Sequence, residues 1–138
     1  MKLIFSYIEV ENSVHGSYMR RDIHIESINN EVCNVRHARM LSRYISDLNI
    51  HPTVIDWVFD GIYKVETGLS ISEERSGEYH RAIYAKDSVV IDCTLADDND
   101  PEWPKETFTI AEVKIALEGW KRFLEMPESL DSVVEVYI

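Results

Sequence analysis

An acidic run around one tryptophan is the first stretch of the sequence that suggests chemistry. Residues 91–106 read IDCTLADDNDPEWPKE, and their carboxylates are those of Asp92, Asp97, Asp98, Asp100, Glu102 and Glu106. An EF-hand loop that began at Asp98 would place Trp103 where the sharp turn needs glycine, and Thr109 where the bidentate glutamate belongs. The run therefore does not match a calcium loop of that type, and we expect no bound metal and no cofactor.

The same run has the features of a docking surface. Pro101 and Pro104 flank Trp103 and restrict the backbone, which lowers the entropic cost of holding the indole in place. Tryptophan is enriched among binding hot spots, and nearby carboxylates attract the lysine and arginine side chains of a partner. The alternative is that Trp103 packs beneath the loop and anchors it. We predict a partner-binding site that consists of Asp97, Asp98, Asp100, Glu102 and Trp103.

Two cysteines and five histidines are the other candidates for metal binding or nucleophilic catalysis. Cys33 and His37 are four residues apart, but no C-x-x-C or H-x-x-x-H pair accompanies them, so a zinc site is not expected. Cys93 with His80 on a neighbouring strand, together with Asp92, is the one candidate catalytic set. Because the surrounding carboxylates disfavour a thiolate, we expect Cys93 to be a buried core residue. A carboxylate pair for glycoside hydrolysis stays open, although no two carboxylates stand out.

Five arginines in the first third of the chain could contact an anion. Arg36, Arg39 and Arg43 share one face of an expected helix, and Arg20 and Arg21 precede them on an expected strand. Such a stripe is more often a solvated surface that pairs with neighbouring carboxylates, and we expect that here.

The elements that must position these residues begin with a β-hairpin. In MKLIFSYIEV, Leu3, Phe5 and Tyr7 alternate with Ile4 and Ser6, which predicts a strand. In RRDIHIESI the side chains of Ile23 and Ile25 share one face, which predicts a second strand. Gly16 lies in the polar stretch between the two runs and is expected to form the turn.

Apolar periodicity and capping residues predict three helices. The first covers residues 32–48, and its buried stripe consists of Ala38, Leu41, Ile45 and Leu48. The second is expected to begin at an N-cap Thr53, to end at Gly68 and to be the most buried of the three. The third begins with a capping box of Thr109 and Glu112.

Short β-rich runs complete the pattern at the start of LSISEERSGEY and at residues 79–85, 88–94 and 132–138. Strands gather in hairpins and do not alternate strictly with helices, which favours the α+β class. We predict a mainly antiparallel sheet of hairpins with about three helices packed on one face. A length of 138 residues is typical of one domain, expected to cover residues 1–138.

The charge is distributed unevenly along the chain. Residues 1–50 carry six basic and six acidic groups, whereas residues 51–138 carry 8 basic and 19 acidic groups, which is the whole net charge of −11. Such a field repels nucleic acid and anionic lipid and speeds encounter with cationic partners. No apolar run approaches the roughly 20 residues that span a bilayer, and two cysteines are too few for a disulfide framework. We therefore expect a cytoplasmic protein that binds neither nucleic acid nor membranes.

With these features the chain resembles the immunity proteins of bacterial toxin-immunity pairs, including those of contact-dependent inhibition systems. The residues that carry the resemblance are DDNDPEWPKETF and the following EVKIALEGWKRFLE helix. The resemblance concerns general character and implies a protein that binds and blocks a toxin domain, often a basic nuclease. The leading hypothesis is then a binding protein, without enzymatic activity, that docks and neutralises a basic partner protein. The alternatives are a small enzyme that uses Cys93 and His80 or a carboxylate pair, and a structural or dimerisation subunit that uses the edge of SVVEVYI.

Overall fold

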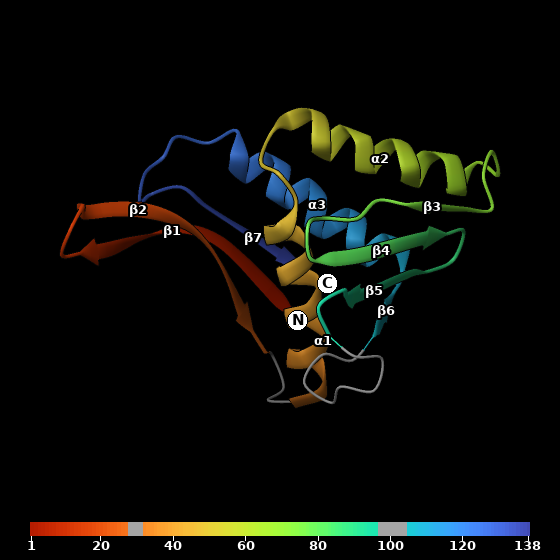
Figure 1. Cartoon of the computed structure of the whole chain (residues 1–138), viewed down its shortest axis with the longest axis horizontal. Helices are drawn as coiled ribbons and strands as arrows, with labels where there is room; N and C mark the ends of the chain where they lie inside the picture. Colours follow the sequence, from red (N-terminus) through yellow and green to blue (C-terminus); the bar gives the residue numbers. More distant parts are fainter. Residues whose placement is uncertain (28–31, 97–104) are drawn as a thin grey trace.

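The computed structural model describes residues 1–27, 32–96 and 105–138, without the side chains of residues 32–34. In this part of the chain, strands form two antiparallel sheets and three helices pack against them (Figure 1). The first sheet has the order β2-β1-β7 and consists of β1 (Lys2–Asn12), β2 (Gly16–Glu26) and β7 (Val133–Tyr137). The second has the order β3-β4-β5-β6 and consists of β3 (Ser72–Glu74), β4 (His80–Ala85), β5 (Val89–Cys93) and β6 (Glu106–Phe108). The helices are α1 (Val32–Asp47), α2 (Pro52–Glu66) and α3 (Ile110–Leu124).

The first sheet is built on the long β1–β2 hairpin. Leu3 and Phe5 are buried on one face of β1, and Phe5 is level with Ile23 of β2 and Val134 of β7. Gly16 adopts a φ of 72°, a left-handed conformation that costs glycine little because it has no Cβ. In the described part of the chain β2 pairs with β1 alone, so no described strand pairs with its other edge, which we call the open edge.

The second sheet follows from alternating burial along β4. His80, Ala82 and Tyr84 are buried, and their neighbours in sequence are partly exposed. β4 pairs with β5 in a register that sets His80 opposite Cys93. The sequence did not predict β6, because three residues are too few to show an alternating pattern.

α3 covers the inner face of the first sheet. The predicted capping box is confirmed: Glu112 N–H donates to Thr109 Oγ1 at 3.1 Å, and Thr109 N–H donates to Glu112 Oε1 at 3.0 Å. The Trp120 ring meets the Phe5 ring edge-on, with centroids 5.3 Å apart. Gly119 faces the sheet where an added Cβ would collide with Val136 and Phe5, so the helix backbone lies close to the strands.

α1 packs against strands of both sheets and against α3, and its predicted stripe of Ala38, Leu41, Ile45 and Leu48 is buried. Tyr44 lies at the centre, where its hydroxyl donates to the Arg75 carbonyl at 2.5 Å and lies 3.0 Å from the Tyr84 hydroxyl. Since Tyr44 donates to the carbonyl, Tyr84 is the donor between the two hydroxyls. Burial raises the pKa of both phenols well above the ordinary value of 10.0.

The α+β class is confirmed, while two predictions for α2 are wrong. The N-cap is His51, whose Nδ1 accepts from Thr53 N–H, because Pro52 fits the first helical position and moves the start of the helix forward. Nor is α2 the most buried helix, since Trp57 and Tyr63 are exposed and α3 buries more residues. Gly68, with a φ of 76°, follows the end of α2 as predicted. Within the described residues, no helix combines the length and the apolar character needed to cross a membrane.

Candidate functional site

The residues predicted to form the docking surface cannot be placed. Asp97, Asp98, Asp100, Glu102 and Trp103 all lie outside the described residues. The docking surface around Trp103 therefore stays a prediction.

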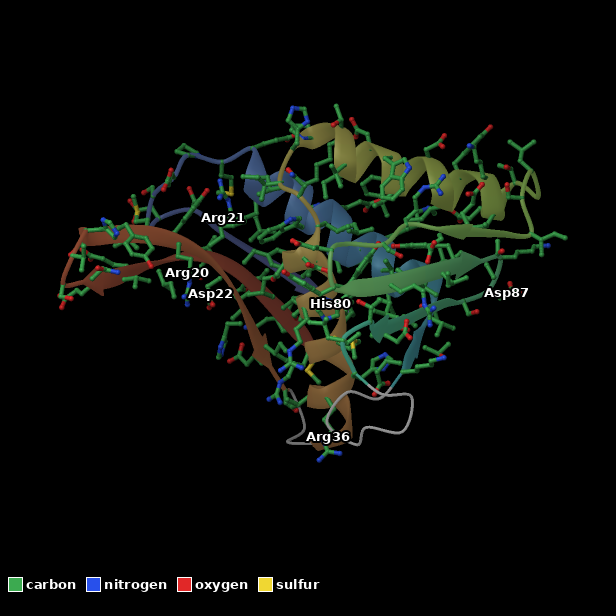
Figure 2. The ribbon with its side chains drawn as sticks, in the orientation of Figure 1. Arg20, Arg21, Asp22, Arg36, His80 and Asp87 are labelled. Atoms are coloured by element: carbon green, nitrogen blue, oxygen red, sulfur yellow. The ribbon has the colours of Figure 1, made fainter. Side chains whose placement is uncertain are left out.

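Arginines from β2 and α1 meet at one hollow of about 680 Å³. Arg20 and Arg21 come from β2, Arg39 and Arg43 come from α1, and His80 from the start of β4 also lines the space. We call this hollow, with these five residues, the arginine groove. Figure 2 shows Arg20 and Arg21 on β2 and His80 at the beginning of β4, while Arg36 lies toward the other end of α1 and does not line the groove.

The α1 wall of the groove is one face of the helix. Arg39, Ser42, Arg43 and Ser46 line the hollow at spacings of three and four residues, which places them in a row on the helix surface. The opposite wall is β2, so the groove runs between a helix face and a strand that has an open edge.

Several of the arginines in the first third of the chain have no carboxylate partner among the described residues. In residues 1–27, 32–96 and 105–138, no carboxylate lies in ion-pair range of Arg20, Arg36 or Arg39. The Arg21 guanidinium lies over the Tyr7 ring at 5.5 Å, and its buried Nε has no hydrogen-bond partner. Arg36 and Arg39 are exposed, as expected of a solvated stripe, and their pairing to carboxylates stays a prediction.

His80 is held at the groove by Asp47, the last residue of α1. Asp47 Oδ2 accepts from the N–H groups of Tyr79 and His80 at 2.7 and 2.8 Å, and lies 3.2 Å from His80 Nδ1. A carboxylate that accepts two backbone hydrogen bonds needs a donor at its third contact, so the His80 proton is assigned to Nδ1. His80 is only 8% exposed, and its Nε2 is buried without a partner. His80 therefore lines a hollow that arginines share, and it carries a buried nitrogen without a partner among the described residues.

The predicted catalytic set is brought only partly together. His80 and Cys93 are opposite each other in the β4–β5 register, and Cys93 is buried as expected, at 7% exposure. However, His80 Nδ1 faces Asp47, and Asp92 forms a bidentate pair with Arg81 at 3.1 and 2.7 Å. Since Nε2 also lacks a partner, no hydrogen bond joins the Cys93 thiol to the imidazole within the described residues.

His37 has a different role from the one that its spacing to Cys33 suggested. Its Nδ1 lies 2.9 Å from Glu106 Oε2, its Nε2 lies 3.6 Å from Glu112 Oε2, and its ring stacks on Phe108. His37 thus ties α1 to β6 and to the first turn of α3, while the Cys33 side chain is not described. In residues 1–27, 32–96 and 105–138, no group of His, Cys, Asp and Glu side chains is arranged to hold a metal ion.

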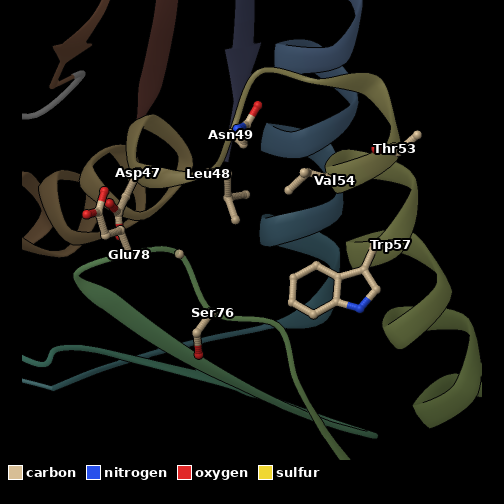
Figure 3. A pocket seen from close by; sticks show the side chains of 9 residues that line it. Asp47, Leu48, Asn49, Thr53, Val54, Trp57, Ser76 and Glu78 are labelled. Carbon is tan, nitrogen blue, oxygen red and sulfur yellow. The ribbon is translucent and has the colours of Figure 1, made fainter.

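A second hollow, of about 610 Å³, adjoins the groove at Asp47. Figure 3 shows the Trp57 indole from α2 on one side of it, and Asp47 and Glu78 on the other. Trp57 is 43% exposed, and the Arg75 guanidinium lies 4.9 Å from its ring centroid. This hollow is acidic and aromatic, in contrast to the arginine groove beside it.

Guanidinium groups grouped in this way are suited to hold an anion. Arginine presents several N–H donors in a plane and binds carboxylate or phosphate oxygens in pairs. The sequence suggested that these arginines could contact an anion, but gave no sign that Arg36 would be left out or that His80 would join, since His80 and Asp47 are 33 residues apart.

No curated protein and no solved structure matches the chain. Over residues 1–136 the chain matches a family whose description is "Family of unknown function (DUF5376)", and it belongs to that family.

Proposed function

We propose that this chain is a small binding protein that holds an anionic group of its ligand in the arginine groove. The observation that carries the proposal is the gathering of four arginines at one hollow of a chain whose net charge is −11. Many cations elsewhere in the described chain have carboxylate partners, and these are Lys2, Lys64, Arg75, Arg81, Lys114 and Lys121. The groove gathers four arginines against two aspartates, Asp22 and Asp47, and is therefore a local cationic site on an acidic protein.

The guanidinium donors of the groove support a ligand that brings acceptor atoms. A buried donor without a partner costs about 1 to 3 kcal/mol, and Arg21 Nε is in that position. Neighbouring guanidinium groups also repel one another. A bound anion offsets the repulsion and can accept hydrogen bonds from the guanidinium groups.

The test is a nuclear magnetic resonance titration of the ¹⁵N-labelled full chain with three probes: inorganic phosphate, citrate and a hexaglutamate peptide. We expect at least one probe to shift the signals of β2 and of residues 39–47 in α1. Arg39→Gln should weaken the binding of that probe by about five- to tenfold, because the substitution removes one charge from the wall of the groove.

The matched control is Arg122→Gln, which removes an exposed arginine from α3, away from the groove. It should leave the affinity within about twofold of wild type. The proposal is wrong if no probe perturbs β2 and α1 at millimolar concentration, or if Arg39→Gln and Arg122→Gln weaken binding equally.

A second candidate is the docking and neutralisation of a basic partner protein, as an immunity protein neutralises its cognate toxin. The observation that favours it is the hollow beside the groove, where an exposed Trp57 indole shares the space with the Glu78 carboxylate. An indole face with a carboxylate nearby attracts lysine and arginine side chains. The sequence prediction of Asp97, Asp98, Asp100, Glu102 and Trp103 as partner-binding residues belongs to this candidate.

An octalysine peptide is the probe for this second candidate. We expect it to shift the Trp57 indole N–H signal at low salt, and Glu78→Gln to reduce the affinity about two- to fivefold. This candidate loses its support if the Trp57 signal does not change. It also loses its support if a triple variant binds the peptide as tightly as wild type at every salt concentration; the variant carries Asp97→Asn, Asp98→Asn and Asp100→Asn.

A further inference from the structure

We infer that the ligand of the arginine groove is an acidic polypeptide segment that binds in extended conformation, as a strand added to the open edge of β2. The inference rests on the proposed function, because it names the chemical class of the anion that the groove holds. It also gives the open edge of β2 a role.

The groove follows the edge of β2 and not one face of its sheet. Arg20 and Asp22 belong to the face that carries Ile4 and Ile8 of β1, whereas Arg21 belongs to the face that carries Tyr7. Residues of both faces line the same hollow. That arrangement arises where a hollow runs along the strand margin, and there every second residue of an edge strand directs its N–H and C=O groups outward.

The dimensions of the two walls fit a short strand. Arg39 to Ser46 spans about 10 Å along α1 at 1.5 Å per residue. Arg20 to Ile25 spans about 17 Å along β2 at 3.3 Å per residue. An added segment of about four to six residues would lie along the strand and be flanked by the helix, which is a recurring way to bind extended peptides.

The charges favour a peptide with alternating acidic residues. In an extended segment every second side chain points the same way, so acidic residues two apart can meet the arginines of the walls. Ile23 and Ile25 are partly buried at the groove and offer contact to an apolar side chain between them. A nucleic acid is disfavoured, because its many phosphates would meet a protein of net charge −11 beyond the groove.

The experiment compares two peptides with the same side chains. One is acetyl-Glu-Val-Glu-Val-Glu-Val-amide, and the other has alternate backbone nitrogens methylated on the edge that would pair with β2. Each is titrated into the ¹⁵N-labelled full chain beside inorganic phosphate and a nucleoside triphosphate, with hydrogen exchange of the β2 amides as a second measurement. A third peptide, methylated on the opposite edge, controls for the effect of methylation on peptide shape.

Strand addition predicts that the unmodified peptide slows the exchange of alternate β2 amides about tenfold or more. It predicts that methylation of the pairing edge weakens binding at least tenfold, while methylation of the opposite edge changes it about twofold. If both methylated peptides bind like the unmodified one, or if phosphate or the nucleotide binds and the peptide does not, the strand inference is wrong and the anion-binding function stands. If no probe perturbs β2 and α1, both are wrong.

Discussion

Asp47 ends α1 and accepts hydrogen bonds from Tyr79 and His80, so one carboxylate joins the helix wall of the arginine groove to the start of β4. The contacts with Tyr79 N–H, His80 N–H and His80 Nδ1 all use the same oxygen. A carboxylate at the end of a helix is unfavourable by about 0.3 to 1 kcal/mol, because the dipole is negative there. The hydrogen bonds must outweigh this cost.

Asp47→Ala should therefore lower the free energy of unfolding by about 1 to 3 kcal/mol, since it leaves the partly buried His80 N–H and Nδ1 without their acceptor. Urea denaturation measures the change. Asp87→Ala, in the exposed turn between β4 and β5, is the matched control and should stay within about 0.5 kcal/mol of wild type. Equal stability of the two variants would contradict the role given to Asp47.

The buried phenols of Tyr44 and Tyr84 give a second prediction at the residue scale, which concerns stability at alkaline pH. Burial raises the pKa of Tyr44 and Tyr84 above 10.0, so above pH 10 the unfolded chain releases these protons more readily than the folded one. The stability that the phenols contribute is then fully present below pH 10. Above pH 10 the free energy of unfolding falls as the pH rises, by about 1.4 kcal/mol per pH unit for each phenol.

Tyr84→Phe removes one of the two phenols and should make the loss of stability between pH 10 and pH 11 less steep. Urea denaturation at pH 7, 10 and 11 gives the slope for wild type and variant. Tyr137→Phe, at an exposed position, should leave the slope unchanged. A Tyr84→Phe slope as steep as that of wild type would show that Tyr84 ionises alike in both states.

At the scale of elements, the local patterns predicted most of the fold. The alternating apolar residues of the β1–β2 hairpin and the capping box of Thr109 and Glu112 act over a few residues, so the sequence shows them directly. The groove depends on how β2 lies against α1, and the second sheet depends on pairing β5 with a three-residue strand. Neither leaves a periodic signal, which is why the fold class could be predicted and the arginine groove could not.

For a change of Gly119 to alanine, helix propensity predicts a gain of stability, whereas the close packing of α3 on the first sheet predicts a loss. Alanine is favoured over glycine inside a helix by about 1 kcal/mol. At Gly119, however, a Cβ would collide with Val136 and Phe5, and overpacking of this kind costs typically about 1 to 3 kcal/mol.

Gly119→Ala should therefore lower the free energy of unfolding despite the better helix former, and the combination Gly119→Ala with Val136→Ala should lose less than the sum of the two single changes. Thermal and urea denaturation of the three variants measure this. A more stable Gly119→Ala variant would mean that α3 and β7 can separate without cost.

At the scale of the whole molecule, the arginine groove is a cationic site on a chain with a net charge of −11. An anionic ligand is repelled by the acidic remainder of the chain and attracted by the groove. At physiological ionic strength the Debye length is about 8 Å, so the distant carboxylates are screened while the contacts inside the groove are screened less. Asp22 lines the groove as well and opposes an anion at short range.

The most direct test of the anion-binding function is calorimetric titration of wild type, Arg39→Gln and Asp22→Asn with whichever of phosphate, citrate and hexaglutamate binds most tightly. The account predicts that Asp22→Asn binds about two- to tenfold more tightly than wild type and that Arg39→Gln binds more weakly. A gain of affinity cannot come from a damaged fold. Equal affinities in the three proteins, or no binding by any probe, would contradict the assignment of the groove as an anion site.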